Sequence, residues 1–140
     1  MSALSNYLES ALLQEIFNGV NYAAPSTWVA LYTTATDDAG GGTEVIGGSY
    51  VRVRVYANSG GTPDWNVAAV DGVGYVVDNN DDITFPTASG SWGVVEWFAI
   101  VDTASGACNF LYHGQLDAPK TVGSGDTFKF SAGNLNLRLE

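Results

Sequence analysis

The stretch Trp92-Gly-Val-Val-Glu-Trp-Phe-Ala-Ile-Val101 is the most hydrophobic in this 140-residue chain, and only Glu96 interrupts it. An apolar run of this length, bounded by turn residues and rich in β-branched and aromatic side chains, predicts a strand in the core of a β-sheet. Trp28-Val-Ala-Leu-Tyr-Thr-Thr34 has the same character and predicts a second central strand, buried on both faces. The fold is therefore expected to be built from strands.

In the segment from Tyr50 to Tyr56, the residues enclosed by the two tyrosines alternate strictly between valine and arginine. Successive side chains of a strand point to opposite faces, so the three valines are expected on one face and Arg52 and Arg54 on the other. Between the two predicted strands, the glycine- and aspartate-rich segment from Asp37 to Gly48 predicts a long exposed loop.

Further short strands are predicted at Trp65–Val70, Gly74–Asp78, Ile83–Pro86 and Asn109–Leu116, with a connection from Pro119 to Asp126. Near the C-terminus, two alternating runs, 128–130 and 135–139, flank a turn and predict a hairpin. Eight or nine strands with turn signals about every ten residues are typical of a sandwich. We expect an all-β fold, a single jelly-roll-like or Greek-key β-sandwich over residues 27–140.

One N-terminal amphipathic α-helix is predicted over residues 3–19, within a single domain that spans 1–140. Ser5 or Asn6 is suited to cap its start, and Gly19 is suited to end it. We expect its apolar stripe to be an assembly interface that packs against another chain or closes a homotrimer; the alternative is that the helix covers an open end of the sandwich. The stripe repeats at helical spacing and consists of Leu4, Leu8, Leu12 and Ile16.

The charge of the chain restricts its partners. With five Lys and Arg, fifteen Asp and Glu, and a formal net charge of −10, the chain is not expected to bind nucleic acid or an anionic membrane. No apolar run approaches the roughly 20 residues that span a bilayer, and residues 1–20 lack the basic start of a signal peptide. Cys108 is the only cysteine, so no internal disulfide is expected, which fits synthesis in a reducing host cytoplasm.

Catalytic chemistry has few candidates. His113 is not accompanied by a nucleophile motif and is expected to be structural or solvent-facing. Glu96 is the single acid inside an apolar strand, and a buried carboxyl group is suited to general-acid catalysis in a glycosidase. Pairing of Glu96 with Arg52 or Arg54, or an outward orientation, is the simpler interpretation. We expect no catalytic residue and no cofactor.

Two further features were weighed as binding sites. The loop of Asp78, Asp81 and Asp82, with its two asparagines, offers oxygen ligands that Ca²⁺ prefers, but it lacks the spacing of an EF-hand, and a solvated turn is the favoured interpretation. Asp37 and Asp38 have the same interpretation, so no metal site is expected. Trp65 lies in a polar segment and is expected to be an exposed contact residue, whereas most of the other aromatic residues are expected in the core.

A set of strand and turn motifs distributed over nearly the whole chain is similar to a family of small virion structural proteins of tailed bacteriophages, whose members are described as tail-fibre or head proteins. The motifs are Met1-Ser-Ala-Leu-Ser-Asn-Tyr-Leu-Glu9, Trp28-Val-Ala-Leu-Tyr-Thr-Thr34, Thr43-Glu-Val45, Gly48-Ser-Tyr-Val-Arg52, Ile83-Thr-Phe-Pro86, Ser91-Trp-Gly93, Phe98-Ala-Ile-Val-Asp102, Leu111-Tyr-His-Gly114, Gly125-Asp126 and Ala132-Gly-Asn134.

The resemblance implies a non-enzymatic component of a phage particle. We expect a capsid decoration or cement protein on the outer surface of the virion, which stabilises the head through contacts with the major capsid protein or other virion proteins. Decoration is favoured because the chain is short and has no coiled-coil shaft. The alternative is a tail-fibre or baseplate component that contacts a host receptor through loops 37–48 and 57–66. A carbohydrate-binding module is more remote, and a hydrolase is the least favoured class.

Overall fold

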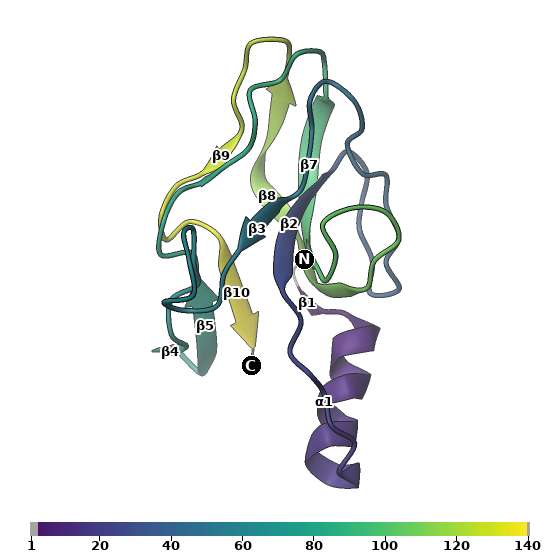
Figure 1. The fold of residues 1–140 in the computed structure, drawn as a ribbon, viewed down its shortest axis with the longest axis vertical. Coiled ribbons are helices and arrows are strands. Elements are labelled where there is room, and N and C mark those ends of the chain that lie inside the picture. Colours follow the sequence, from purple (N-terminus) through teal and green to yellow (C-terminus); the bar gives the residue numbers. More distant parts are fainter. Residues whose placement is uncertain (1–2, 140) are drawn as a thin grey trace.

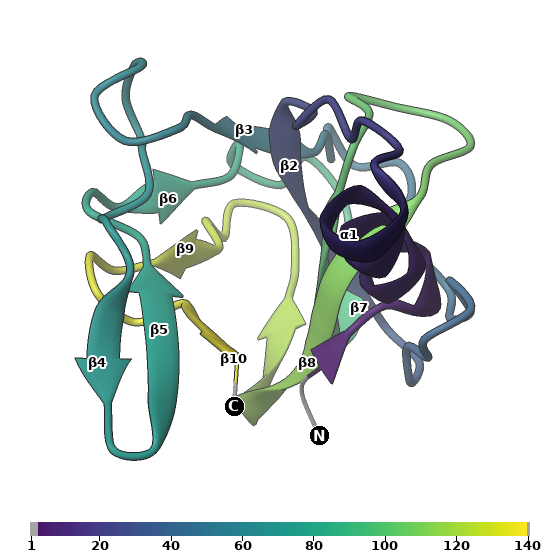
Figure 2. The same ribbon diagram turned by 90° about the horizontal axis from the view of Figure 1, so that it is seen from below.

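The computed structural model describes residues 3–139, which form one helix and three antiparallel sheets (Figures 1 and 2). The helix α1 spans Asn6–Asn18. The largest sheet has the order β1-β8-β7-β2-β3 and consists of β1 (Ala3–Leu4), β8 (Phe110–Val122), β7 (Gly93–Val101), β2 (Thr27–Tyr32) and β3 (Val53–Val55). The two smaller sheets are β10-β5-β4, made of Asn136–Leu139, Gly74–Asp78 and Ala69–Asp71, and β6-β9, made of Ile83–Thr84 and Lys129–Phe130.

This arrangement agrees with an all-β fold that carries one N-terminal helix. The strands are divided among three sheets, so the jelly-roll or Greek-key sandwich stays a prediction. The strand at Asn109–Leu116 is longer than expected, because β8 continues through Pro119 to Val122. Proline is tolerated there because β1 pairs with β8 only at Tyr112 and His113, which leaves the outer side of the later residues without a paired strand.

The two strands predicted at the centre of the fold, β2 and β7, are buried on both faces. Val29 and Leu31 of β2 point into the main core, whereas Ala30 and Tyr32 belong to a second apolar cluster on the opposite face of the sheet. Phe110 of β8 completes this second cluster and packs edge-on against Tyr32, with ring centroids 5.4 Å apart. The near-continuous apolar runs are thus explained by the two apolar clusters, one on each face of the sheet.

A β-bulge at Glu96 interrupts the pairing of β7 with β8, between Val95 and Trp97. Only Glu96 lies between Val95 and Trp97 in β7, whereas four residues, 116–119, lie between their partners Gln115 and Lys120 in β8. The alternation of faces shifts across this irregularity, and Val95 and Phe98 therefore both reach the main core although three positions separate them. Glu96 is half-buried at this irregularity. The pairing of Glu96 with Arg52 or Arg54 was wrong, because Arg52 binds Glu44, and Arg54 lies over the rings of Trp28 and Tyr56.

The predicted C-terminal hairpin does not form. β9 pairs with β6, and β10 pairs with β5, so the two runs belong to different sheets. The fully buried side chain of Asn79 holds the bend between them: its Nδ2 donates to the carbonyl oxygen of Ser131 at 3.0 Å, and its Oδ1 accepts from the backbone N–H of Leu135 at 2.8 Å. A single buried amide therefore redirects the chain from one sheet to the next.

Arg52 is buried and fixes the loop 37–48 to the sheet. Its Nε and Nη2 donate to the two carboxylate oxygens of Glu44, each at 2.8 Å, and it also donates to the backbone carbonyls of Thr103 and Gly106 at 3.0 and 2.9 Å. The hydrogen bonds that Arg52 donates to Glu44 raise the pKa of Arg52 above its ordinary value, although burial acts in the opposite direction. The β3 strand is confined to Val53–Val55. Val53 and Val55 contact the main core, whereas Arg54 lies over Trp28 of the second cluster, so the predicted alternation is confirmed in this strand.

We expect Glu44→Gln to lower the free energy of unfolding by about 2 kcal/mol, because the substitution leaves the buried guanidinium without its counter-charge. Urea denaturation measures this change. The matched control is Arg54→Gln at the exposed arginine of the same segment, which is expected to cost less than about 1 kcal/mol. Equal stability of Glu44→Gln and the parent chain would contradict the expectation.

Candidate assembly surface

The start of α1 is attached to the edge of the large sheet. Ala3 and Leu4 form β1, which pairs with His113 and Tyr112 of β8, so the helix begins at Asn6 and not at residue 3 as predicted. Ser5 is fully buried at the junction, where its Oγ accepts from the backbone N–H of Leu8 at 3.2 Å and donates to the carbonyl of Phe110. Ser5 is therefore the N-cap, one of the two caps that the sequence offered.

The far end of α1 extends away from the β body (Figure 1). The helix ends at Gly19, whose φ of 67° is left-handed, as expected for a glycine terminator. No residue of α1 is fully buried, and three large apolar side chains near its C-terminal end are more than half exposed. We call these three residues the distal arc: Leu13 (57% exposed), Ile16 (70%) and Phe17 (74%).

An apolar groove with a volume of about 450 Å³ lies between α1 and the sheet β10-β5-β4. Leu8 and Leu12 line it on the helix side, and Val77 and Leu137 line it on the sheet side. Figure 2 views this end of the molecule, with α1 and the β4-β5 pair on opposite sides of β10. We call this feature the apolar groove.

The face of the small sheet that borders the apolar groove is exposed and apolar at its rim. Tyr75 pairs with Leu139 on one side and with Val70 on the other, so these three side chains share a face with Val77 and Leu137. Their exposed fractions are 57% for Tyr75, 55% for Leu139 and 70% for Val70. Sequence reasoning missed this rim because it assigned residues 135–139 to a hairpin with 128–130.

The predicted stripe of Leu4, Leu8, Leu12 and Ile16 is divided by the structure. Leu4 and Leu8 pack against the main core of their own chain, Leu12 is half-buried in the wall of the apolar groove, and Ile16 is exposed. Leu4 belongs to β1 and not to the helix. The first half of the stripe thus covers the β body, and an assembly role stays a proposal for the second half.

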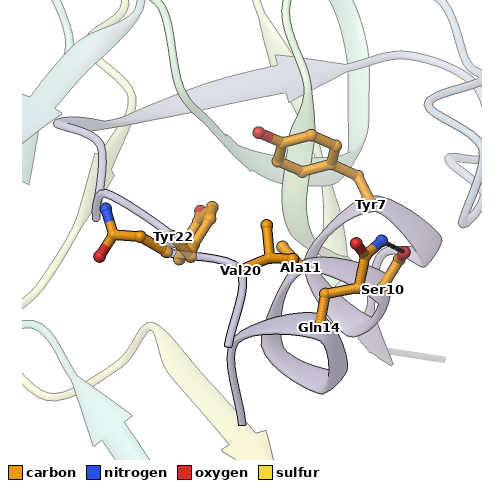
Figure 3. A pocket seen from close by; sticks show the side chains of 7 residues that line it. Tyr7, Ser10, Ala11, Gln14, Val20 and Tyr22 are labelled. Atoms are coloured by element: carbon orange, nitrogen blue, oxygen red, sulfur yellow. Dashed lines mark hydrogen bonds between the residues drawn. The ribbon is translucent and has the colours of Figure 1, made fainter. Parts of the chain in front are cut away.

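The side of α1 that faces away from the apolar groove is covered by the chain that returns toward β2. Figure 3 shows Tyr7, Ser10, Ala11 and Gln14 of the helix around a hollow of about 380 Å³ that Val20 and Tyr22 close. The rings of Tyr7 and Tyr22 meet edge-on at 6.5 Å, and burial raises the pKa of Tyr22. This returning segment leaves the distal arc uncovered.

Trp65 was predicted as an exposed contact residue, and this prediction was wrong. It is 9% exposed and belongs to the main core, where its indole N–H donates to the Thr27 hydroxyl at 3.0 Å. A bridge to Asn79 fixes its backbone. Trp65 lies in the lining of the apolar groove and is not a free aromatic platform.

His113 occupies a buried position in β8 and contacts polar groups with both ring nitrogens. Nδ1 lies 2.9 Å from the Thr36 hydroxyl, and Nε2 lies 2.7 Å from the Asp38 carboxylate. The carbonyl of Asp38 in turn accepts from the backbone N–H of Asn6, at the first residue of α1. His113 therefore ties the loop 37–48 to the sheet and, through Asp38, to the start of the helix.

The acidic loop 78–82 is bonded to protein donors. Asp78 accepts from the Asn66 amide at 2.8 Å, and Asp82 accepts from the Ala132 backbone N–H at 2.9 Å and from Lys129 at 3.2 Å. Among residues 3–139, no three His, Cys, Asp or Glu side chains are grouped so that they could hold a metal ion. The same described range contains no helix long and apolar enough to cross a bilayer.

The two loops considered for receptor contact are held by their own aspartates. The Asp37 carboxylate accepts from the backbone N–H groups of Ala39 and Gly41, which lower the pKa of Asp37. In the loop 57–66, Asp64 accepts from the backbone N–H of Ser59 at 2.7 Å and from the Asn80 amide at 3.0 Å, and these bonds lower the pKa of Asp64. Receptor contact through these loops stays a prediction.

Comparison with known protein families assigns the class of the molecule. The chain is a member of a family of tailed-phage virion structural proteins of the tail-fibre type. It belongs to the family described as podophage GP4 fiber I protein gp80, whose model matches residues 3–138. The resemblance drawn from the sequence motifs is thus confirmed. No curated protein matches the chain.

The division of the helix stripe predicts that two substitutions differ in their effect on the free energy of unfolding. We expect Leu8→Ser to lower the free energy of unfolding by about 2 kcal/mol, because Leu8 packs against the core. Ile16→Ser is expected to change it by less than about 0.5 kcal/mol, because the side chain is solvent-exposed. Urea denaturation of dilute protein measures both, and a large loss for Ile16→Ser would show that the distal arc supports the fold itself.

The lowered pKa of Asp64 predicts a pH-dependent contribution to stability. A carboxylate with a depressed native pKa stabilises the fold above its ordinary pKa of about 4 and loses that effect as the pH falls through the native pKa. We expect Asp64→Asn to be less stable than the parent at pH 7 and to approach it in acid. Thermal melting between neutral and acid pH tests this, and a constant difference across the range would contradict it.

Proposed function

We propose that this protein is a non-enzymatic structural component of a phage tail fibre, and that it acts by binding other virion proteins through the apolar groove and the distal arc. The observation that carries the proposal is the match of residues 3–138 to a fibre family. Capsid decoration, which the short chain favoured at first, fits this finding less well. The short chain then represents one unit of a larger fibre and not its whole length.

The surface chemistry supports a binding role. Exposed apolar residues normally occur singly on a soluble monomer, whereas contiguous apolar patches mark contact sites. The distal arc and the rim of the apolar groove are such a patch at one end of the molecule. Glu15 is the only charged residue between Ser10 and Ser26, so this end can be desolvated at little electrostatic cost.

The two strongest candidates for chemistry serve the fold in this proposal. His113 uses both ring nitrogens to hold Thr36 and Asp38. Glu96 lies at the bulge of β7 and is half-buried by the strands around it. Both residues are therefore assigned positioning roles within the sheet, and assembly is the function proposed for the protein.

The composition of the phage particle tests the location. We expect quantitative mass spectrometry of purified virions to find far fewer copies of this chain than of the major capsid protein, and immunogold labelling to mark the tail. Particles that lack the chain are expected to lose adsorption to host cells while they retain filled heads. A near-equal ratio to the major capsid protein, with label over the head, would instead establish decoration.

A further inference from the structure

We propose that the partner of the apolar groove is a second copy of this chain, whose distal arc packs into the groove. The proposal rests on the proposed assembly function and names the partner of that site. The same end of one molecule carries both a protruding apolar helix end and an apolar hollow. A neighbouring copy provides the complement of each feature.

The helical spacing makes the two features continuous. Leu8 and Leu12 line the apolar groove, and Ile16 follows Leu12 by one turn at the lip of the same wall. Leu13 and Phe17 lie further around the helix, away from both the apolar groove and the returning segment that contains Val20. Ile16 is therefore the member of the distal arc that adjoins the apolar groove.

The available area is sufficient for a specific contact between copies. The exposed apolar surface at this end equals that of about four fully exposed large residues. It is the sum of the exposed fractions of the distal arc, Val20, Val70, Tyr75 and Leu139. At roughly 150–200 Å² for each large residue, this corresponds to about 600–800 Å² per copy. A standard interface takes about 800 Å² from each partner, so a reciprocal contact, in which each copy inserts its distal arc into the apolar groove of the other, approaches that size.

The low density of charged residues favours self-association through this end. The chain carries a net charge of −10, and two copies repel each other wherever their acidic loops meet. Ser10–Ser26 contributes only Glu15, and Arg138 beside the apolar groove is paired with Asp71. Contact through the helix end and the apolar groove thus brings two acidic proteins together along their least charged surface.

Sedimentation velocity and light scattering of the purified full-length chain test the inference. We expect an oligomer whose association constant falls by roughly ten-fold or more in Phe17→Ser and, separately, in Leu139→Ser, because truncation of large apolar side chains at an interface has effects of this size. The matched control is Ile46→Ser, which removes an 85% exposed isoleucine from the loop 37–48 and is expected to leave association unchanged. Phe17 and Leu139 are themselves exposed, so these variants retain the fold.

A crosslink between unlike copies tests the geometry. One chain carries Phe17→Cys and a size tag, the other carries Leu139→Cys, and both carry Cys108→Ser. Oxidation of the mixture is expected to join tagged and untagged chains, whereas Ile46→Cys in place of Phe17→Cys is expected to give no such product. An oligomer that forms no Phe17 to Leu139 crosslink would overturn the proposed contact.

A parent chain that stays monomeric at every concentration reached would also overturn the inference. The copy number and tail labelling of virions are measured independently of self-association. A monomer that is nevertheless found in the tail would leave the fibre role intact and assign the apolar groove to a different virion protein. Failure of the inference and failure of the proposed function are therefore distinguishable.

Discussion

The hydrogen bonds of Ser5 determine where the helix leaves the β body. Ser5 is fully buried, caps α1 through the Leu8 N–H, and bonds to Phe110 and Leu111 of β8. The helix therefore starts from a fixed point on the edge of the large sheet, and its first turn lies against the core. Because a rigid helix continues in the direction of its first turn, this junction also sets the direction in which the distal arc points.

The helix gains its stability unevenly along its length. An isolated helix of 13 residues is marginal in water, and most helical stability in proteins comes from packing of an apolar face. Leu8 supplies such packing near the start, but Ile16 and Phe17 supply none within the chain. The last turns are instead held by the Gly19 cap and by the backbone N–H of Val20, which donates to the carbonyl of Gln14 at 3.1 Å. The exposed apolar residues at these last turns therefore contribute little to the fold, which leaves them available for the contact proposed above.

The parts of the fold that depend on local pattern were predictable from the sequence. The apolar runs of β2 and β7 and the glycine end of α1 follow from side-chain periodicity and backbone conformation, which neighbouring residues determine. The pairing of β10 with β5 was not predictable in this way, because it depends on the buried amide of Asn79, whose partners lie more than 50 positions away. Trp65 was misjudged for the same reason, since its indole N–H bonds to Thr27 and its backbone forms a bridge with Asn79, both of which are distant in sequence. The stripe on the helix was found, but the wall opposite it depends on strand pairing between distant segments.

In the proposed self-association, the acidic surface and the apolar end have complementary effects. Like charges over most faces oppose contact between copies, and this repulsion acts against the many wrong orientations in which two copies can meet. Apolar surface at one end supplies attraction in the orientation that aligns helix and groove, and the attraction does not depend on charge. Arg52 adds no positive patch to the exterior, because Glu44 neutralises it in a buried position. A chain with so few exposed cations thus combines broad repulsion with one local attraction, and this combination favours ordered contacts over indiscriminate aggregation.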